Sequence, residues 1–108
     1  MKTEYKFGEV YELGNQVGSY DDALNFRNVF ETENGGVALV GFKAGQKLDT
    51  HTAPAEVIIT VLEGSIDFTM LDRTHTLNAG EFLLMGANVP HSVKAKKNSK
   101  VMIVKVKN

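Results

Sequence analysis

The chain contains no cysteine, and this absence limits the chemistry that it can perform. It excludes a disulfide framework, a thiolate nucleophile and a metal held by cysteine sulfur. A bound metal must therefore take its ligands from His, Asp, Glu or water. The first residues, MKTEYKFGEVYELG, also lack an apolar run. We therefore expect a cytoplasmic protein with no signal peptide, no transmembrane segment and no membrane partner.

Motifs of several common enzyme classes are also missing. The sequence has no G-x-G-x-x-G motif and no phosphate-binding loop. No serine or threonine lies in a nucleophile-elbow pattern, so Ser65, Ser92 and Thr60 are expected to be ordinary polar strand residues. These absences leave the histidines and carboxylates as the candidate residues for chemistry.

The composition is that of one soluble domain. The chain has 108 residues, of which 43% are hydrophobic and 23% charged, and its formal net charge is -1. This length allows one sizeable core but not two, so residues 1–108 are predicted to form a single domain.

Positive charge gathers at the C-terminal end, where residues 94–108 contain six lysines and no acidic residue. Such a tail raises the alternative of nucleic-acid binding, but no aromatic residue is interleaved there to stack on bases. The lysines in VKAKKNSK fall in an apparent hairpin turn, and those in VMIVKVKN alternate with valine along a predicted strand. We interpret them as solvent-facing lysines of an edge strand and expect no nucleic-acid partner.

Short segments rich in Val, Ile, Phe, Leu and Met recur from residue 24 onwards and predict strands. Turn signals separate them at intervals of about eight to twelve residues, which is typical of an all-β sandwich or barrel. The strongest signal is Asn34-Gly35-Gly36, because glycine adopts the positive φ that tight hairpins need. No helical period competes with this pattern, and residues 14–22 are predicted to be a loop. The main predicted strands are LNFRNVF, VALVGFKA, EVIITVL, SIDFTML, EFLLMG and VMIVKV.

The segment EVIITVL is apolar on both of its faces. Val57 and Ile59 lie on one side of the predicted strand, and Ile58 and Leu62 lie on the other. One face can fill the interior of a barrel, whereas the other must pack on a second sheet or on another subunit. We therefore expect a homodimer.

Two longer stretches, GQKLDTHTAPAEVIITVLEG and GEFLLMGANVPHSVKA, resemble the paired motifs of the cupin superfamily. Gly45, His51 and Gly64 fall in register with the first motif, at about 45–64. Gly80 and His91 fall in register with the second, at about 80–95. The resemblance is to small single-domain cupins of a subgroup without an assigned activity. It implies an all-β double-stranded β-helix, which is a jelly-roll barrel.

The metal motif that the resemblance implies is degenerate in this chain. Two of its four ligand positions hold Ala53 and Val57 in place of histidine and glutamate, and only His51 and His91 remain. Two imidazoles alone rarely hold a catalytic metal tightly, because such sites usually take three protein ligands.

A third ligand could come from Glu56 or His75. Glu56 is one residue away from the family position, so it would need a bulge to face inward. His75 would need an inward orientation on its strand. With either ligand, the resemblance implies a divalent transition metal as cofactor, namely zinc, iron, manganese or nickel.

Three functions are left open by these residues. The first is a binding module for a small organic ligand, metal-free or with a rebuilt metal site, in which His51 and His91 are the polar anchors. The second is a metal-dependent cupin enzyme of the dioxygenase, isomerase or lyase type. The third is an assembly protein whose barrel serves mainly to dimerise. The candidate apolar lining of the binding site is Val57, Ile59, Phe68, Met70 and Phe82.

Overall fold

The computed structural model describes residues 1–18 and 23–107, and their regular structure is almost entirely β. One 3-10 turn, η1 (Leu13–Asn15), precedes the strands. Part of the loop predicted at 14–22 falls on residues 19–22, which lie outside the described ranges. The strands are β1 (Asn25–Thr32), β2 (Gly35–Phe42), β3 (Lys47–His51), β4 (Glu56–Glu63), β5 (Ser65–Met70), β6 (Arg73–Asn78), β7 (Phe82–Met85), β8 (His91–Ala95) and β9 (Ser99–Val106).

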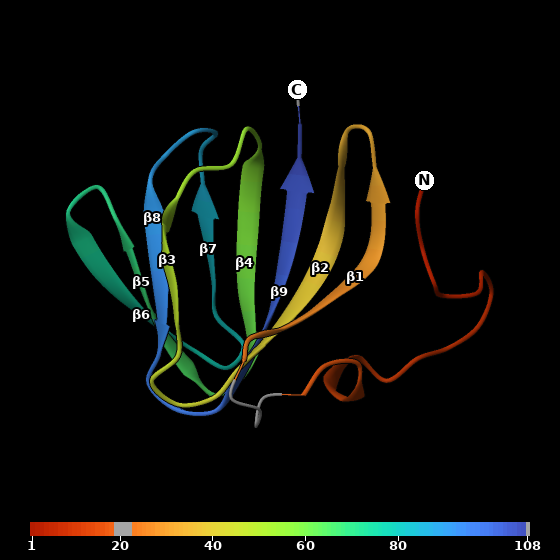
Figure 1. The fold of residues 1–108 in the computed structure, drawn as a ribbon, viewed down its shortest axis with the longest axis horizontal. Coiled ribbons are helices and arrows are strands. Elements are labelled where there is room, and N and C mark those ends of the chain that lie inside the picture. The colour runs from red at the N-terminus through yellow and green to blue at the C-terminus, as the bar shows by residue number, and fades with distance from the viewer. Residues whose placement is uncertain (19–22, 108) are drawn as a thin grey trace.

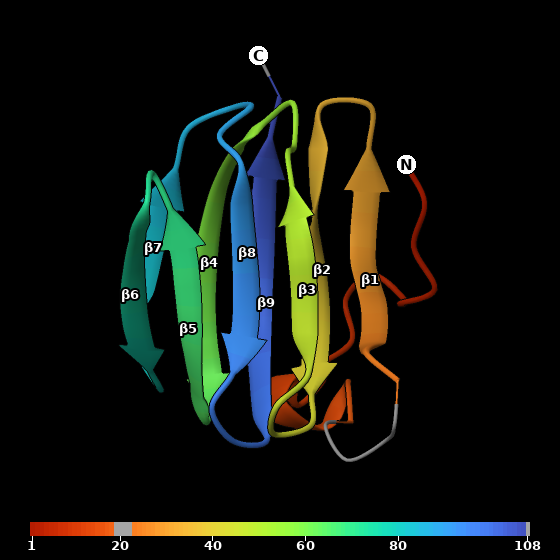
Figure 2. The ribbon, with the colours of Figure 1, turned by 60° about the vertical axis from the view of Figure 1, so that its left-hand side comes forward.

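These strands form two antiparallel sheets that face one another (Figures 1 and 2). One sheet has the order β1-β2-β9-β4-β7 and the other has the order β3-β8-β5-β6. Only the hairpins β1–β2 and β5–β6 stay within one sheet, and every other connection crosses to the opposite sheet. The predicted all-β jelly-roll barrel is thereby confirmed. Within the described ranges, no helix is long and apolar enough to span a membrane.

The predicted turn residues occur between strands. Asn34 ends the short connection between β1 and β2. Leu71 and Asp72 connect β5 to β6 with φ values of 50° and 59°, as a two-residue hairpin loop requires when both residues are left-handed.

The barrel interior is sealed at one end and open at the other. Val40, Phe42, Val61, Ile66 and Val101 pack at the sealed end and are at most 1% exposed. We call the opposite end the mouth; it is where β3, β5 and β9 end and β8 begins, at the top of Figure 1.

Ser99 links the two sheets at the sealed end. Its hydroxyl oxygen accepts a hydrogen bond from the Ser65 backbone N–H at 3.0 Å. The same hydroxyl lies 3.1 Å from the Ser65 carbonyl oxygen and 2.7 Å from that of Lys97, so it can donate to either. Because Ser99 begins β9 and Ser65 begins β5, these bonds tie one sheet to the other.

An extra residue in β3 decides which of its side chains faces the interior. Leu48 pairs with Val93, whereas His51 pairs with His91, so β3 has one more residue than β8 between the two pairs. Since side chains alternate along a strand, this bulge places His51, and not Thr50, opposite His91.

A second bulge acts in the same way on β1. Its register with β2 shifts between Asn28 and Phe30, after which Glu31 pairs with Gly36. Gly36 also pairs with Lys105 on β9. Glu31 and Lys105 therefore share the inner face of the sheet, close to the mouth.

The edge-strand interpretation of the C-terminal lysines is wrong. β9 is the central strand of its sheet, and the turn before it joins the two sheets and does not close a hairpin. Lys105 is in phase with Val101 and Ile103, which face the interior, and it pairs with the buried Val57. Lys100, on the opposite face, forms an ion pair with Glu63 at 3.3 Å.

Candidate functional site

His51 and His91 meet at the mouth of the barrel. They are cross-strand partners at the end of β3 and the start of β8. Their ring centroids lie 4.1 Å apart, with an angle of 58° between the ring planes. His91 is only 7% exposed, whereas His51 is exposed to solvent. Two imidazoles from distant parts of the sequence thus form one pair.

Backbone carbonyls hold both rings in the same tautomer. Nδ1 of His51 lies 2.8 Å from the Asp49 carbonyl oxygen, and Nδ1 of His91 lies 3.0 Å from that of Val89. A carbonyl oxygen can only accept, so each Nδ1 carries the hydrogen and donates. Each neutral ring then has its lone pair on Nε2. Within the described ranges, neither Nε2 has a hydrogen-bond partner.

Phe68 supports the inner side of the pair. Its ring stacks on His91 with centroids 5.5 Å apart and an interplanar angle of 9°. Burial lowers the pKa of the His91 imidazole below its usual value of 6.5. The hydrogen bond to Val89 raises this pKa, while the nearby charges of His51 and Lys105 lower it. His91 is therefore disposed to be neutral near pH 7 and to accept a hydrogen bond at Nε2.

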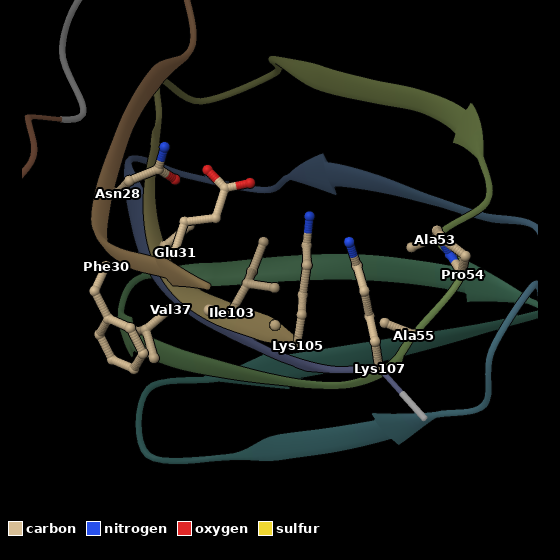
Figure 3. Close-up of a pocket in the computed structure, with 13 residues that line it drawn as sticks. Asn28, Phe30, Glu31, Val37, Ala53, Pro54, Ala55, Ile103, Lys105 and Lys107 are labelled. Atoms are coloured by element: carbon tan, nitrogen blue, oxygen red, sulfur yellow. The ribbon is translucent and has the colours of Figure 1, made fainter. Parts of the chain in front are cut away.

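A pocket of about 260 Å³ is lined by β1, β2, β9 and the segment 53–55; neither histidine lines it, but Ala53 follows His51 by two residues, so the pocket and the pair adjoin at the mouth. Figure 3 shows Lys105 and Lys107 extending into the pocket side by side, with Glu31 on one side and Ala53 and Pro54 on the other. Sequence reasoning missed Lys105, Lys107 and Glu31. The usable signal was that Lys105 is in phase with inward-facing apolar residues of its own strand.

The expected apolar lining is divided between the interior and the outer surface. Val57, Ile59 and Phe68 lie in the core below the pair, and Met70 packs against that core and pairs with His91. The prediction that Phe82 lines the binding site is wrong, because Phe82 is 61% exposed and pairs with Thr60 on the outer face of the sheet. In β7 the inward positions are Leu83 and Met85.

Neither candidate third metal ligand joins the histidine pair. Glu56 pairs with Val106 on the outer face, so no bulge turns it inward. His75 shares the inner face with its partner Phe68, but its strand lies two positions from β8 in the sheet. Across residues 1–18 and 23–107, no group of three or more metal-binding side chains converges. The donor set therefore does not fit a three-ligand catalytic metal site.

Comparisons with known proteins agree with this architecture. A family model described as "Cupin domain" matches residues 38–107. A conserved Streptococcus pyogenes protein of unknown function is 23% identical, with a TM-score of 0.91, and the match covers 100% of this chain and 96% of that chain. A cupin 2 conserved barrel domain protein from Leptotrichia buccalis is 26% identical, with a TM-score of 0.86, covering 90% of this chain and 47% of that one.

More distant structures share the fold alone. A mutant salicylate 1,2-dioxygenase from Pseudoaminobacter salicylatoxidans is 14% identical, with a TM-score of 0.72, covering 82% of this chain and 28% of that chain. Among curated proteins, no sequence matches the chain. The family match spans well over half of the residues, including both histidines and Lys105. The chain therefore belongs to the cupin domain family.

Proposed function

We propose that this protein binds a small organic ligand at the mouth of its barrel, with His51 and His91 as the polar anchors. The observation that carries the proposal is the pairing of these imidazoles, 4.1 Å apart, with both Nε2 atoms left to accept hydrogen bonds. Pockets for small molecules are typically apolar with a few convergent polar groups. Ala53, Pro54 and Ala55 give the adjoining pocket small apolar walls, and Phe68 backs the His91 ring from the core.

The proposal can be tested by screening neutral and charged fragments against the untagged protein. The imidazole nitrogen signals of His51 and His91 would be followed by NMR. We expect some fragments to shift both signals, and His51→Ala and His91→Ala each to weaken that binding. If no fragment, charged or neutral, perturbs either imidazole, the proposal fails.

A metal-dependent enzyme is the alternative, and one observation favours it. The tautomer held by the two backbone carbonyls is also the one that offers Nε2 to a metal. Two imidazoles would then need a third ligand that the described residues do not bring together. Elemental analysis of untagged protein, purified without chelator, separates the two functions. Stoichiometric metal that is lost in His91→Ala would favour the enzyme over metal-free binding.

We also propose that two copies associate through the outer face of the larger sheet. Phe82, Leu84 and Val106 are 61%, 69% and 53% exposed there. Leu84 and Val106 line a shallow apolar pocket on this face together with Ile58 and Val104, and Glu56 lies beside them. Burying these side chains against a second copy would remove the large apolar groups of this face from water. Light scattering would test this proposal, and a clean monomer at micromolar concentration would refute it.

A further inference from the structure

The pocket beside the histidines carries two positive charges on its β9 wall. Lys105 and Lys107 extend into the pocket from the central strand and from the residue that follows it (Figure 3). Within the described ranges, neither ammonium forms an ion pair with a carboxylate. Lys100, on the outer face of the same strand, does form one, with Glu63. The two unpaired charges lie close to the mouth of the barrel.

The histidine pair offers the opposite kind of polar group. In the neutral form of each ring, with Nδ1 donating to a carbonyl, Nε2 presents a lone pair, which accepts a hydrogen bond and repels an anion. A ligand that interacts with both the lysines and the imidazoles must therefore place an anion beside the ammonium groups and a hydrogen-bond donor, such as a hydroxyl, beside the Nε2 atoms. Ala53, two residues after His51, lines the same pocket as Lys105, so the two subsites adjoin at the mouth.

The pocket also limits the size and the charge of its ligand. Its volume of about 260 Å³ suits a molecule of a few heavy atoms beyond a carboxylate. Glu31 stands across the pocket from Lys105 and would repel a second carboxylate. A monoacid is therefore favoured over a diacid.

From these observations we propose that the mouth binds a small hydroxy-monocarboxylic acid. Lys105, with Lys107 beside it, holds the carboxylate, and the hydroxyl donates to Nε2 of the histidine pair. This inference rests on the proposed ligand-binding function and names the chemical class of the ligand. No covalent step is involved.

The test uses three acids, each with two analogues that lack one recognition element. Lactate, 3-hydroxybutyrate and 3-hydroxybenzoate would be titrated into the full, untagged chain, followed by the imidazole signals of His51 and His91. Their amides lack the charge, and propionate, butyrate and benzoate lack the hydroxyl. We expect at least one hydroxy acid to bind about tenfold more tightly than its amide, because ion-assisted hydrogen bonds are lost in the amide. The hydroxyl-free acid should also bind more weakly.

Variants assign the charge preference to its residue. Lys105→Met should remove the advantage of the acid over its amide, and Lys105→Arg should restore part of it. Lys94→Met is the matched control, because Lys94 is exposed on the outer face of the smaller sheet, and it should leave the preference unchanged. Glu31→Gln should act in the opposite direction and tighten acid binding, which a general loss of folding would not do.

The outcomes distinguish this inference from the function on which it rests. It is overturned if the amides bind as tightly as the acids, if Lys105→Met leaves the acid preference intact, or if none of the three acids binds. If neutral fragments still shift the imidazoles, the ligand-binding function stands without it. If nothing shifts them, both fail.

Discussion

Replacing Ser99 with alanine should weaken the closure of the barrel at its sealed end. The Ser99 side chain is 0% exposed, and its oxygen is the acceptor for the Ser65 backbone N–H. The Ser65 carbonyl keeps a bond from the Lys96 N–H, so the main loss is one buried donor without a partner. Leaving such a group unsatisfied costs about 1–3 kcal/mol of unfolding free energy.

Urea unfolding, followed by circular dichroism, measures this loss. The midpoint should fall while the slope with urea stays unchanged, because the substitution alters stability and not the surface exposed on unfolding. Hydrogen exchange at the Ser65 amide should become faster. Ser92→Ala is the control, since Ser92 is half-buried on β8 and its hydroxyl has no hydrogen bond within the described ranges. A Ser99→Ala protein within about 0.5 kcal/mol of this control would refute the reasoning.

Three further predictions concern pH, backbone strain and metal. Burial lowers the pKa of His91, so the folded chain binds fewer protons there than the unfolded chain. The stability linked to this group is complete above the unfolded value of 6.5 and is lost as the pH falls below it. Urea unfolding between pH 8 and pH 5 should show a smaller acid loss in His91→Gln than in the unmodified protein, and equal losses would contradict the assignment. Gly64→Ala should destabilise the fold more than Gly45→Ala in thermal unfolding. Both glycines have φ near +90°, but a Cβ at Gly64 would lie 2.2 Å from Ser99 Oγ, whereas nothing lies within 4 Å of a Cβ at Gly45. Equal losses of thermal stability in the two variants would count against close packing at Gly64. Dialysis against EDTA should leave the midpoint of thermal unfolding unchanged, because the described residues offer a metal no third ligand beside the two imidazoles. A fall of several degrees in this midpoint would show that the protein holds a metal.

The fold and the histidine pair could be predicted from the sequence because their signals are local. Short apolar segments, turn residues and the spacing of the two motifs indicate a jelly roll without knowledge of distant contacts. The position of Glu56 on the outer face also follows from strand alternation alone, since one step from the family position reverses the side of the sheet. His75 faces inward, but alternation does not tell how many strands separate it from His91.

The faces occupied by the C-terminal lysines and by Phe82 could not be predicted from local sequence. The position of β9 between β2 and β4 is a property of the topology, and a strand at the end of a chain carries no local mark of being central. The residues of β7 are apolar at every position, so its sequence, FLLM, does not reveal that Phe82 and Leu84 face outward. Glu31 faces the pocket only because of the shift after Asn28, and no turn residue announces that bulge.

The extra residues in β1 and β3 give this barrel a simple route to new specificity. Inserting one residue between Leu48 and Thr50, with the bulge kept, would present Thr50 to the interior in place of His51, and an equivalent insertion before Phe30 in β1 would present Phe30 in place of Glu31. In each case a side chain already present in the strand turns to the interior, and the sealed end would be untouched. In such a scaffold, insertions and deletions of single residues can alter ligand preference as strongly as substitutions do.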